Sequence, residues 1–319
     1  MTEAPTTNPQ NASQQEAALL FIHAQTSLHP GSGTALGTVD LPVQRERHTQ
    51  WPVIPGSSLK GILRDACRPP ASNAEAREDW LAAFGPETAE ADKHAGALSL
   101  TDARILAFPV RSLRGVFAWI TCSAVLERLQ RDLNLDPSKS NSLELPQSWP
   151  GKDKALCQQN GPLLVDGNKL VLEEFEFERT GDANNTVADW VSQRAVADDA
   201  TRKRLKSHLV VLHDDDFTHF VRHATEVVAR IALDYERKTV KGTALFYEEF
   251  LPAETLFYSV VLASASRREG HDKSASEILK YLRDNLPPIL QIGGDETIGK
   301  GLCAVRLDNG KDGAQCPKQ

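Results

Sequence analysis

AALLFIHAQTSL (residues 17–28) and PGSSLKGILRDACR (residues 55–68) decide the expected fold class, because a strand pattern and a helix pattern follow each other with a loop between them. The first segment is almost wholly apolar, which predicts a buried strand. In the second segment, apolar side chains recur at helical spacing: Leu59, Ile62, Leu63 and Ala66. Ser57 or Ser58 would cap this helix at its N-terminus. The chain therefore opens with a strand, a long loop and a helix.

Strand and helix patterns continue in mixed order along the chain. Helices are predicted at 73–85, 123–133, 182–209 and 274–286. Strands are predicted at 96–110, 115–122, 169–178, 227–234, 244–250, 255–264, 288–292 and 302–307. The two strands that flank the charged turn 235–243 are expected to form a hairpin. This order predicts an α+β fold of ferredoxin-like type with long insertions rather than a doubly wound α/β sheet.

One domain is expected to occupy residues 17–308 of the 319-residue chain. Irregular or polar stretches are expected to be insertions into this domain, at about 69–96, 134–168 and 180–208. Residues 1–16 are polar and lack Lys and Arg, so we expect a disordered tail and no secretory signal. Residues 309–319 are expected to form a C-terminal tail.

Composition narrows the class of protein. Hydrophobic residues make up 40% and charged residues 25% of the chain, which is typical of a globular protein with a sizeable core. No apolar run reaches the roughly 18 residues of a membrane span. Five scattered cysteines without a CxxC pair argue against disulfides or structural zinc, and we expect a reducing, cytoplasmic location. Because the net charge is −7, any nucleic-acid binding must come from local basic patches.

The glycine-rich segment IGGDETIGKGL (292–302) nearly matches the phosphate-binding P-loop. A P-loop needs Ser or Thr after its lysine to hold magnesium, but Gly301 follows Lys300 here. Too little chain follows to build the sheet of an NTPase, so we disfavour a small-nucleotide enzyme. Two interpretations remain: a structural hairpin, or a loop whose glycine N–H groups and lysine bind the phosphates of a polymer.

The stretch between residues 40 and 68 is locally basic, with five basic and three acidic side chains. Lys60 and Arg64 lie four residues apart, so they share one face of the predicted helix. Ser57 and the N-terminus of that helix offer further donors to a phosphate. A solvated helix face is the alternative interpretation. The basic side chains are Arg45, Arg47, Lys60, Arg64 and Arg68.

HDDDFTHFVRH (213–223) and FYEEF, further along, contain other candidate ligands. His219 and His223 are spaced i, i+4 on a predicted helix, as in zinc sites, but the Glu of the HExxH pattern is missing. We therefore attribute the three aspartates to capping and to the helix dipole. In FYEEF, strand geometry places Glu248 and Glu249 on opposite faces, so that one can point into a site.

Two blocks of the sequence resemble a known family: HPGSGTALGTVDLPVQRERHTQWPVIPGSSLKGILRD (29–65) and LQIGGDETIGKG (290–301). They are similar to the backbone subunit of the type III-B CRISPR effector, the Cmr complex, within the RAMP superfamily of RNA-binding proteins. The segments FPVRSLRGVFAW, LVLEEFEFE, TEVVARI and YEEFLPAETLFYS are similar too, so the likeness covers the chain from about Ala17 to Leu307. The resemblance implies a single RAMP-type domain. Its palm would be a modified ferredoxin-like, or RNA-recognition-motif-like, fold with inserted segments that include a thumb-like β-hairpin.

The resemblance also implies partners and an activity. Copies of the subunit stack into a filament along a guide (CRISPR) RNA, together with other subunits of the effector complex and without a membrane. Target single-stranded RNA pairs with the guide, and each copy cuts the target once, at regular intervals. The alternative is a scaffold that holds guide RNA without cutting, as related backbone subunits of other CRISPR types do.

The resemblance assigns residues to the cutting site and to RNA binding. Asp40 is at the position of the cutting aspartate, in the loop after the first strand, and a scaffold would not need a carboxylate there. His29, from HPGSG, and Glu248, from YEE, belong to the same site. Phe250 stands where the family has a tyrosine, which removes a hydroxyl. Together with the basic patch, the expected RNA-binding set is Arg45, Arg47, Ser57, Lys60, Arg64, Gly293, Gly294, Gly299, Lys300 and Gly301.

RNA carries its own nucleophile, the 2′-OH, so the protein needs to add few groups to cleave it. A lone carboxylate is a poor base at its reference pKa of about 4, so we expect Asp40 to hold a divalent ion, Mg²⁺ or Mn²⁺. The ion would neutralise charge that develops on the phosphate. His29 would act as general acid or base, because histidine titrates near neutrality. These assignments predict a metal-dependent endoribonuclease.

Overall fold

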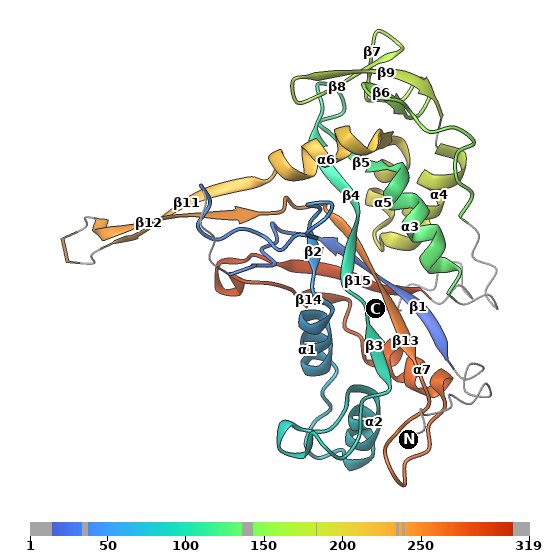
Figure 1. Cartoon of the computed structure of the whole chain (residues 1–319), viewed down its shortest axis with the longest axis vertical. Helices are drawn as coiled ribbons and strands as arrows, with labels where there is room; N and C mark the ends of the chain where they lie inside the picture. The colour runs from blue at the N-terminus through green and yellow to red at the C-terminus, as the bar shows by residue number, and fades with distance from the viewer. Residues whose placement is uncertain are drawn as a thin grey trace, which may run out of the picture.

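The computed structural model describes residues 15–33, 38–135, 143–182, 184–233, 236–237 and 240–308. Within these ranges the protein has the predicted α+β fold, with a curled 13-stranded sheet and a separate two-stranded hairpin (Figure 1). Residues 1–14 and 309–319, which hold most of the two predicted tails, lie outside the described ranges. The domain limits and insertion boundaries remain predictions.

The centre of the sheet is an antiparallel run of strands in the order β15, β1, β13, β4. Their bounds are Leu302–Asp308 for β15, Glu16–Ala24 for β1, Leu256–Ala263 for β13 and Ala103–Arg111 for β4. Shorter strands pair with this run: β14 (Ile289–Gln291), β3 (Leu98–Leu100) and β2 (Val53–Ile54). From residue 18 onward every residue of β1 is buried, which explains why the sequence is apolar without alternation.

Three helices accompany this part of the sheet: α1 (Gly56–Ala66), α2 (Ala74–Phe84) and α7 (Ala275–Asn285) (Figure 1). Helix α2 begins at the predicted cap Asn73, whose side chain accepts a hydrogen bond from the third residue on, and it ends at Gly85 with φ of 101°. Helix α7 begins with a capping box formed by Ser274 and Glu277.

The predicted N-cap of α1 is wrong. The helix begins at Gly56, whose N–H donates to Asp102 Oδ1 at 2.7 Å, and Ser57 and Ser58 are exposed in its first turn. Gly56 packs so closely on the turn before β4 that an added Cβ would lie 2.7 Å from the carbonyl oxygen of Leu100. A contact between segments far apart in the sequence therefore decides where the helix starts.

The other half of the sheet continues from β4 through β5, β10, β6, β9, β8 and β7. Their bounds are β5 Phe117–Cys122, β10 Leu209–Leu212, β6 Lys154–Leu156, β9 Phe175–Gly181, β8 Lys169–Leu172 and β7 Leu164–Val165. Helices α3 (Ser123–Leu133), α5 (Asp199–His208) and α6 (Asp214–His223) pack on β5 of this half, whereas α4 (Asp189–Ala195) packs on β1 and β15. Single turns lie at Thr88–Glu90, Asn184–Ala188 and Glu296–Ile298.

The prediction of one strand at 169–178 is wrong, because the chain reverses within it. Strands β8 and β9 pair antiparallel around a tight turn in which Glu173 has φ of 49°. The N–H of Glu173 donates to the Arg111 carbonyl, and the two side chains form an ion pair at 3.0 Å. The turn is thus held by the end of β4, a contact that the alternating sequence does not reveal.

Strands β11 (Glu226–Leu233) and β12 (Val240–Phe250) form the predicted hairpin, which projects from the body of the protein (Figure 1). Residue 234, at the end of the predicted strand, and residues 235, 238 and 239 of the predicted turn lie outside the described ranges. The root of the hairpin, around Phe250, joins the rest of the chain near the loop that follows β1. Among the described helices, none is long and apolar enough to cross a bilayer.

Candidate functional site

Asp40 lies on the edge of β12 that faces away from β11. Its N–H donates to the carbonyl of Tyr247 at 3.1 Å, and its carboxylate accepts from the Tyr247 N–H at 2.8 Å. The next residue, Leu41, pairs in parallel with Glu248. The loop after β1 therefore extends the pairing of β12, and this pairing holds the exposed Asp40 at the root of the hairpin.

His29 and Glu248 meet at the same part of β12, but both are buried, with 7% and 4% of their surface exposed. Nδ1 of His29 lies 2.7 Å from the carbonyl oxygen of Glu249, and because a carbonyl only accepts, Nδ1 carries a proton. Nε2 faces the carboxylate of Glu248 at 3.6 Å. His29 and Asp40 of the predicted cutting site therefore both contact residues 247–249, the segment that contains the third residue, Glu248.

Glu248 belongs to a charge cluster with Arg230 of β11 and Asp295 of the glycine-rich loop. Nε of Arg230 lies 2.6 Å from the Glu248 carboxylate, and its Nη2 lies 2.6 Å from that of Asp295. Burial raises the pKa of Glu248, and the charge and hydrogen bond of Asp295 raise it further. The positive charges of Arg230 and His29 oppose that rise. The cluster links the hairpin, the glycine-rich loop and His29.

The glycine-rich loop, residues 292–301, connects β14 to β15 and packs on the chain around His29. Gly293 has φ of 82°, and a Cβ there would collide with the carbonyl oxygen of His29. Gly294 N–H donates to that same oxygen at 3.0 Å. Gly301, with φ of 76°, donates its N–H to the Ser27 carbonyl at 2.9 Å. These glycines allow close packing that positions His29, which is a different use from the predicted phosphate cradle.

Two residues of this loop do face outward or toward the site. Gly299 has φ of 78° and open space around it. Lys300 places its ammonium 4.8 Å from the centre of the Phe250 ring, and His29 lies against the same ring at 5.5 Å. Phe250 is fully buried, so the ring that replaces the family's tyrosine forms the floor of the cluster.

The predicted RNA-binding residues Arg45 and Arg47 have different surroundings. Arg45 Nη2 lies 2.5 Å from the buried carboxylate of Glu249, and Nη1 donates to the carbonyls of Gln50 and Val221. Glu249 also accepts the Val43 N–H at 3.0 Å. Arg47 is exposed and forms no ion pair within the described part of the chain. Of the two cations, Arg47 is the one open to a phosphate.

Arg45→Gln should therefore act on folding. Removing the guanidinium leaves the carboxylate of Glu249 buried without a counter-charge, which costs roughly 3 kcal/mol of the free energy of unfolding. Thermal unfolding followed by circular dichroism measures this loss as a lower Tm. The matched variant Arg47→Gln should keep the wild-type Tm but weaken RNA binding, with a salt dependence reduced by about one phosphate contact. A wild-type Tm for Arg45→Gln would contradict the structural role.

The predicted basic face of α1 is largely used inside the protein. Lys60 donates to the carbonyl of Leu98 at 3.0 Å, and its burial lowers its pKa. Arg64 donates to the carbonyls of residues 85 and 86 and stacks on Trp80 at 4.2 Å. Both side chains thus connect α1 to its neighbours. Ser57, exposed in the first turn, is the member of this set that faces solvent.

The part of the chain that the structure describes contains no group of three His, Cys, Asp or Glu side chains that could hold a metal. Asp40 is the exposed carboxylate among the predicted cutting residues, and its oxygens are hard donors that suit Mg²⁺ or Mn²⁺. Mg²⁺ is commonly bound by one or two carboxylates together with water and the phosphates of a substrate. The residues present fit an ion whose coordination the substrate completes, rather than a preformed protein site.

The histidine-rich segment forms α6. The hydrogen bonds at its start differ from the prediction that the three aspartates cap this helix. His213 caps α6 itself by accepting the Asp215 N–H at 3.2 Å. Asp214 instead caps α3, because its carboxylate accepts from Ser123 Oγ at 2.7 Å and from Ala124 N at 3.1 Å. The three aspartates therefore do not all serve the helix that they begin.

Two residues of the site, Arg230 and Asp295, were not predicted from the sequence. The structural role of Glu249 was not predicted either. Arg230 could have been noticed, because it is a charged residue inside the apolar strand VVARIAL. Asp295 lies within the glycine-rich segment, in which the P-loop pattern concerns only the glycines and the lysine.

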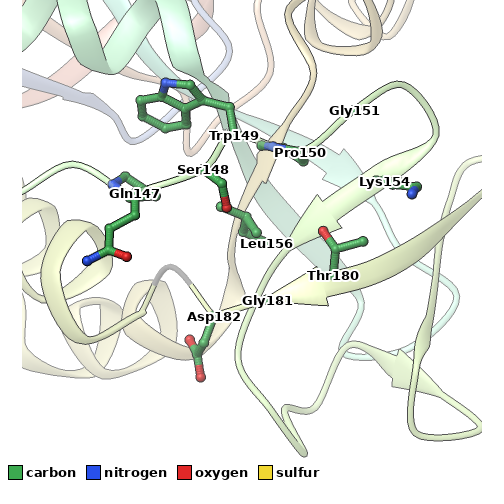
Figure 2. Close-up of a pocket in the computed structure, with 11 residues that line it drawn as sticks. Gln147, Ser148, Trp149, Pro150, Gly151, Lys154, Leu156, Thr180, Gly181 and Asp182 are labelled. Carbon is green, nitrogen blue, oxygen red and sulfur yellow. The ribbon is translucent and has the colours of Figure 1, made fainter.

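A cavity of about 330 Å³, lined by residues that include Trp149, Lys154 and Asp182, shares no residue with this site (Figure 2).

Comparison with known proteins gives a consistent result. Residues 21–304 match the family model described as the RAMP superfamily. The chain is 40% identical over 294 residues to the CRISPR system Cmr endoribonuclease Cmr4 of Pyrococcus furiosus, covering 92% of this chain and 96% of that protein. It is 28% identical over 310 residues to the CRISPR system CMR subunit Cmr4 of Saccharolobus solfataricus, covering 91% and 96%.

Solved structures agree with these sequence matches. The crystal structure of oligomeric Cmr4 from Pyrococcus furiosus superposes with a TM-score of 0.69 at 33% identity, over 92% of this chain and 98% of that one. A chain of the type III-B Cmr-beta complex bound to cognate target RNA gives 0.70 at 25% identity, over 91% and 96%. The family resemblance found in the sequence is confirmed: this chain belongs to the RAMP superfamily and, within it, to the Cmr4 subunits of type III-B CRISPR effector complexes.

Proposed function

We propose that this protein is a backbone subunit of a Cmr effector complex that polymerises along guide RNA and cuts the base-paired target RNA at regular intervals. The observation that carries the proposal is that His29 and Asp40, from the loop after β1, both contact residues 247–249 of β12, the segment that holds Glu248. The family resemblance assigns all three residues to cutting. The Pyrococcus furiosus relative is named an endoribonuclease and belongs to the same family, which supports the same activity here.

Asp40 is the residue we place against the RNA, because it is the exposed carboxylate of the three. The RNA 2′-OH loses its proton and attacks the adjacent phosphorus, the P–O5′ bond breaks, and the leaving 5′ oxygen takes up a proton, so the products are a 2′,3′-cyclic phosphate and a 5′-OH with no net change in protons. His29 keeps its proton on Nδ1, so its Nε2 is the atom that exchanges a proton. The Glu248 carboxylate places a negative charge 3.6 Å from that Nε2.

We propose a divalent ion at Asp40, Mg²⁺ or Mn²⁺, with coordination completed by water and substrate phosphate. Such an ion neutralises the charge that develops on the phosphate during cleavage. The protein's part is to hold the Asp40 carboxylate in one orientation, through the hydrogen bond from Tyr247 N. A single carboxylate gives weak binding without RNA, so the ion should be exchangeable and sensitive to chelators.

RNA binding is proposed for the solvent-facing members of the predicted set, Arg47, Ser57 and Gly299, with Lys300 at the edge of the site. The hairpin of β11 and β12 is proposed as the thumb. The strand order β15, β1, β13, β4, with α1 between β1 and β4 and α7 between β13 and β15, supports the ferredoxin-like palm.

Cleavage of a labelled target RNA by the reconstituted complex tests the proposal. We expect fragments that differ by a constant length, no cutting in EDTA, and full recovery when Mg²⁺ or Mn²⁺ is added back. A guide that does not match the target serves as the control. Target binding without cutting would favour the scaffold alternative. Cutting that persists in EDTA would rule out the proposed divalent ion at Asp40.

A further inference from the structure

We propose that Arg230 is a positioning residue for the cutting reaction: by bridging Glu248 and Asp295 it holds the Glu248 carboxylate ionised and aimed at His29. The inference rests on the proposed function, and it assigns a role to a residue that the family resemblance does not assign to the cutting site. Arg230 acts through Glu248 and does not itself contact the RNA.

The geometry of Arg230 suits this role. In the hairpin register Val228 lies opposite Glu248, and Arg230 is two residues further along β11, so its side chain lies on the same face as Glu248. Its Nε is 2.6 Å from Glu248, and Nη2 is 2.6 Å from Asp295. The guanidinium also lies 5.4 Å from the centre of the Phe250 ring. One planar cation thus contacts two carboxylates and rests on an aromatic floor.

The charges around Glu248 show why a cation is needed there. Asp295 approaches from the glycine-rich loop, Arg230 from β11 and His29 from the chain after β1. The ammonium of Lys300 lies over the Phe250 ring. The carboxylate of Glu249 pairs with Arg45. Two carboxyl groups so close would share a proton without a counter-charge, because like charges in a buried site cannot both ionise.

A protonated Glu248 would no longer place a negative charge 3.6 Å from His29 Nε2. Arg230 lowers the pKa of Glu248 against the effects of burial and Asp295, so removing Arg230 raises that pKa. The carboxylate would then be lost at a higher pH than in the wild type. The acidic limb of the pH–rate profile should move upward, while cutting at high pH, where Glu248 is ionised again, should recover.

The test is the pH dependence of single-turnover target cleavage by the reconstituted complex. Arg230→Gln should move the acidic limb up by about one pH unit or more, a shift typical for loss of an adjacent charge. Arg230→Lys should restore most of the wild-type profile. Arg230→Gln combined with Asp295→Asn should move the limb back, since the competing carboxylate is also gone. Arg222→Gln, an exposed arginine on α6, serves as the matched control and should leave the profile unchanged.

Guide and target binding measured on the same samples should stay within about twofold of wild type. An equal fall in rate at every pH for Arg230→Gln would mean a merely structural role and would overturn the inference, as would an unchanged profile. If the wild-type complex binds target but does not cut it, the proposed function itself is wrong. The behaviour of the wild-type sample therefore separates the two failures.

Discussion

Asp40→Asn should abolish target cutting while guide and target binding remain. The amide has the size of the carboxylate, and its oxygen can still accept the Tyr247 N–H, so the pairing of the loop with β12 survives. What is lost is the negative charge that holds the ion. Loss of such a group typically lowers the rate by about 10² to 10³ or more.

Single-turnover cleavage and filter binding, on the same reconstituted complexes, measure the two properties separately. Asp65→Asn makes the same chemical change at an exposed position on α1, and it should cut at the wild-type rate. Asp40→Ala is less informative, because it also removes the hydrogen bond to Tyr247. If Asp40→Asn cut within threefold of wild type, Asp40 would not be the cutting residue.

Gly293→Ala should lower both stability and cutting. The new Cβ would meet the carbonyl oxygen of His29, and the residue would have to keep φ of 82°. The left-handed conformation alone costs an L-residue roughly 1–2 kcal/mol, and the backbone collision should bring the total above about 3 kcal/mol. Because the collision pushes on His29, cutting should fall even in the fraction that remains folded.

Gly270→Ala is the matched control for this variant, because Gly270 lies outside the proposed cutting and RNA-binding residues. Gly270 has φ of 71° in the loop before α7, and no atom lies within 4 Å of its added Cβ. Its Tm should fall only by the conformational term, and cutting should be close to wild type. Thermal unfolding and cleavage below the Tm of both variants measure the difference. Equal loss of stability in the two variants would show that the contact with His29 is unimportant.

Local features of the site were predictable, and the partners of each residue were not. The spacing of apolar residues predicted α1, and the Asn73 and Gly85 signals predicted both ends of α2. The start of α1 at Gly56 and the reversal at Glu173 depend on contacts with Leu100 and Arg111, which no local pattern encodes.

The same limit applies to the charged residues. Arg45 was predicted to bind RNA from its place in a basic run, but its partner Glu249 is 204 positions away in the chain. Arg64 likewise uses its donors on the carbonyls that end α2. A basic residue in a sequence has no visible counter-charge until the fold brings one to it. The family resemblance grouped His29, Asp40 and Glu248, and the structure brings these three residues to one part of β12, while their roles stay predictions.

The pairing of Asp40 with Tyr247 has a consequence for where the protein can cut. The carboxylate is fastened to the same strand that forms the hairpin, so the two cannot shift independently along a bound RNA. With Asp40 as the proposed cutting residue, we expect the spacing between cuts in a filament of identical copies to equal the spacing between hairpins. We therefore expect the measured length of the RNA fragments to equal the length of RNA that one subunit of the filament spans.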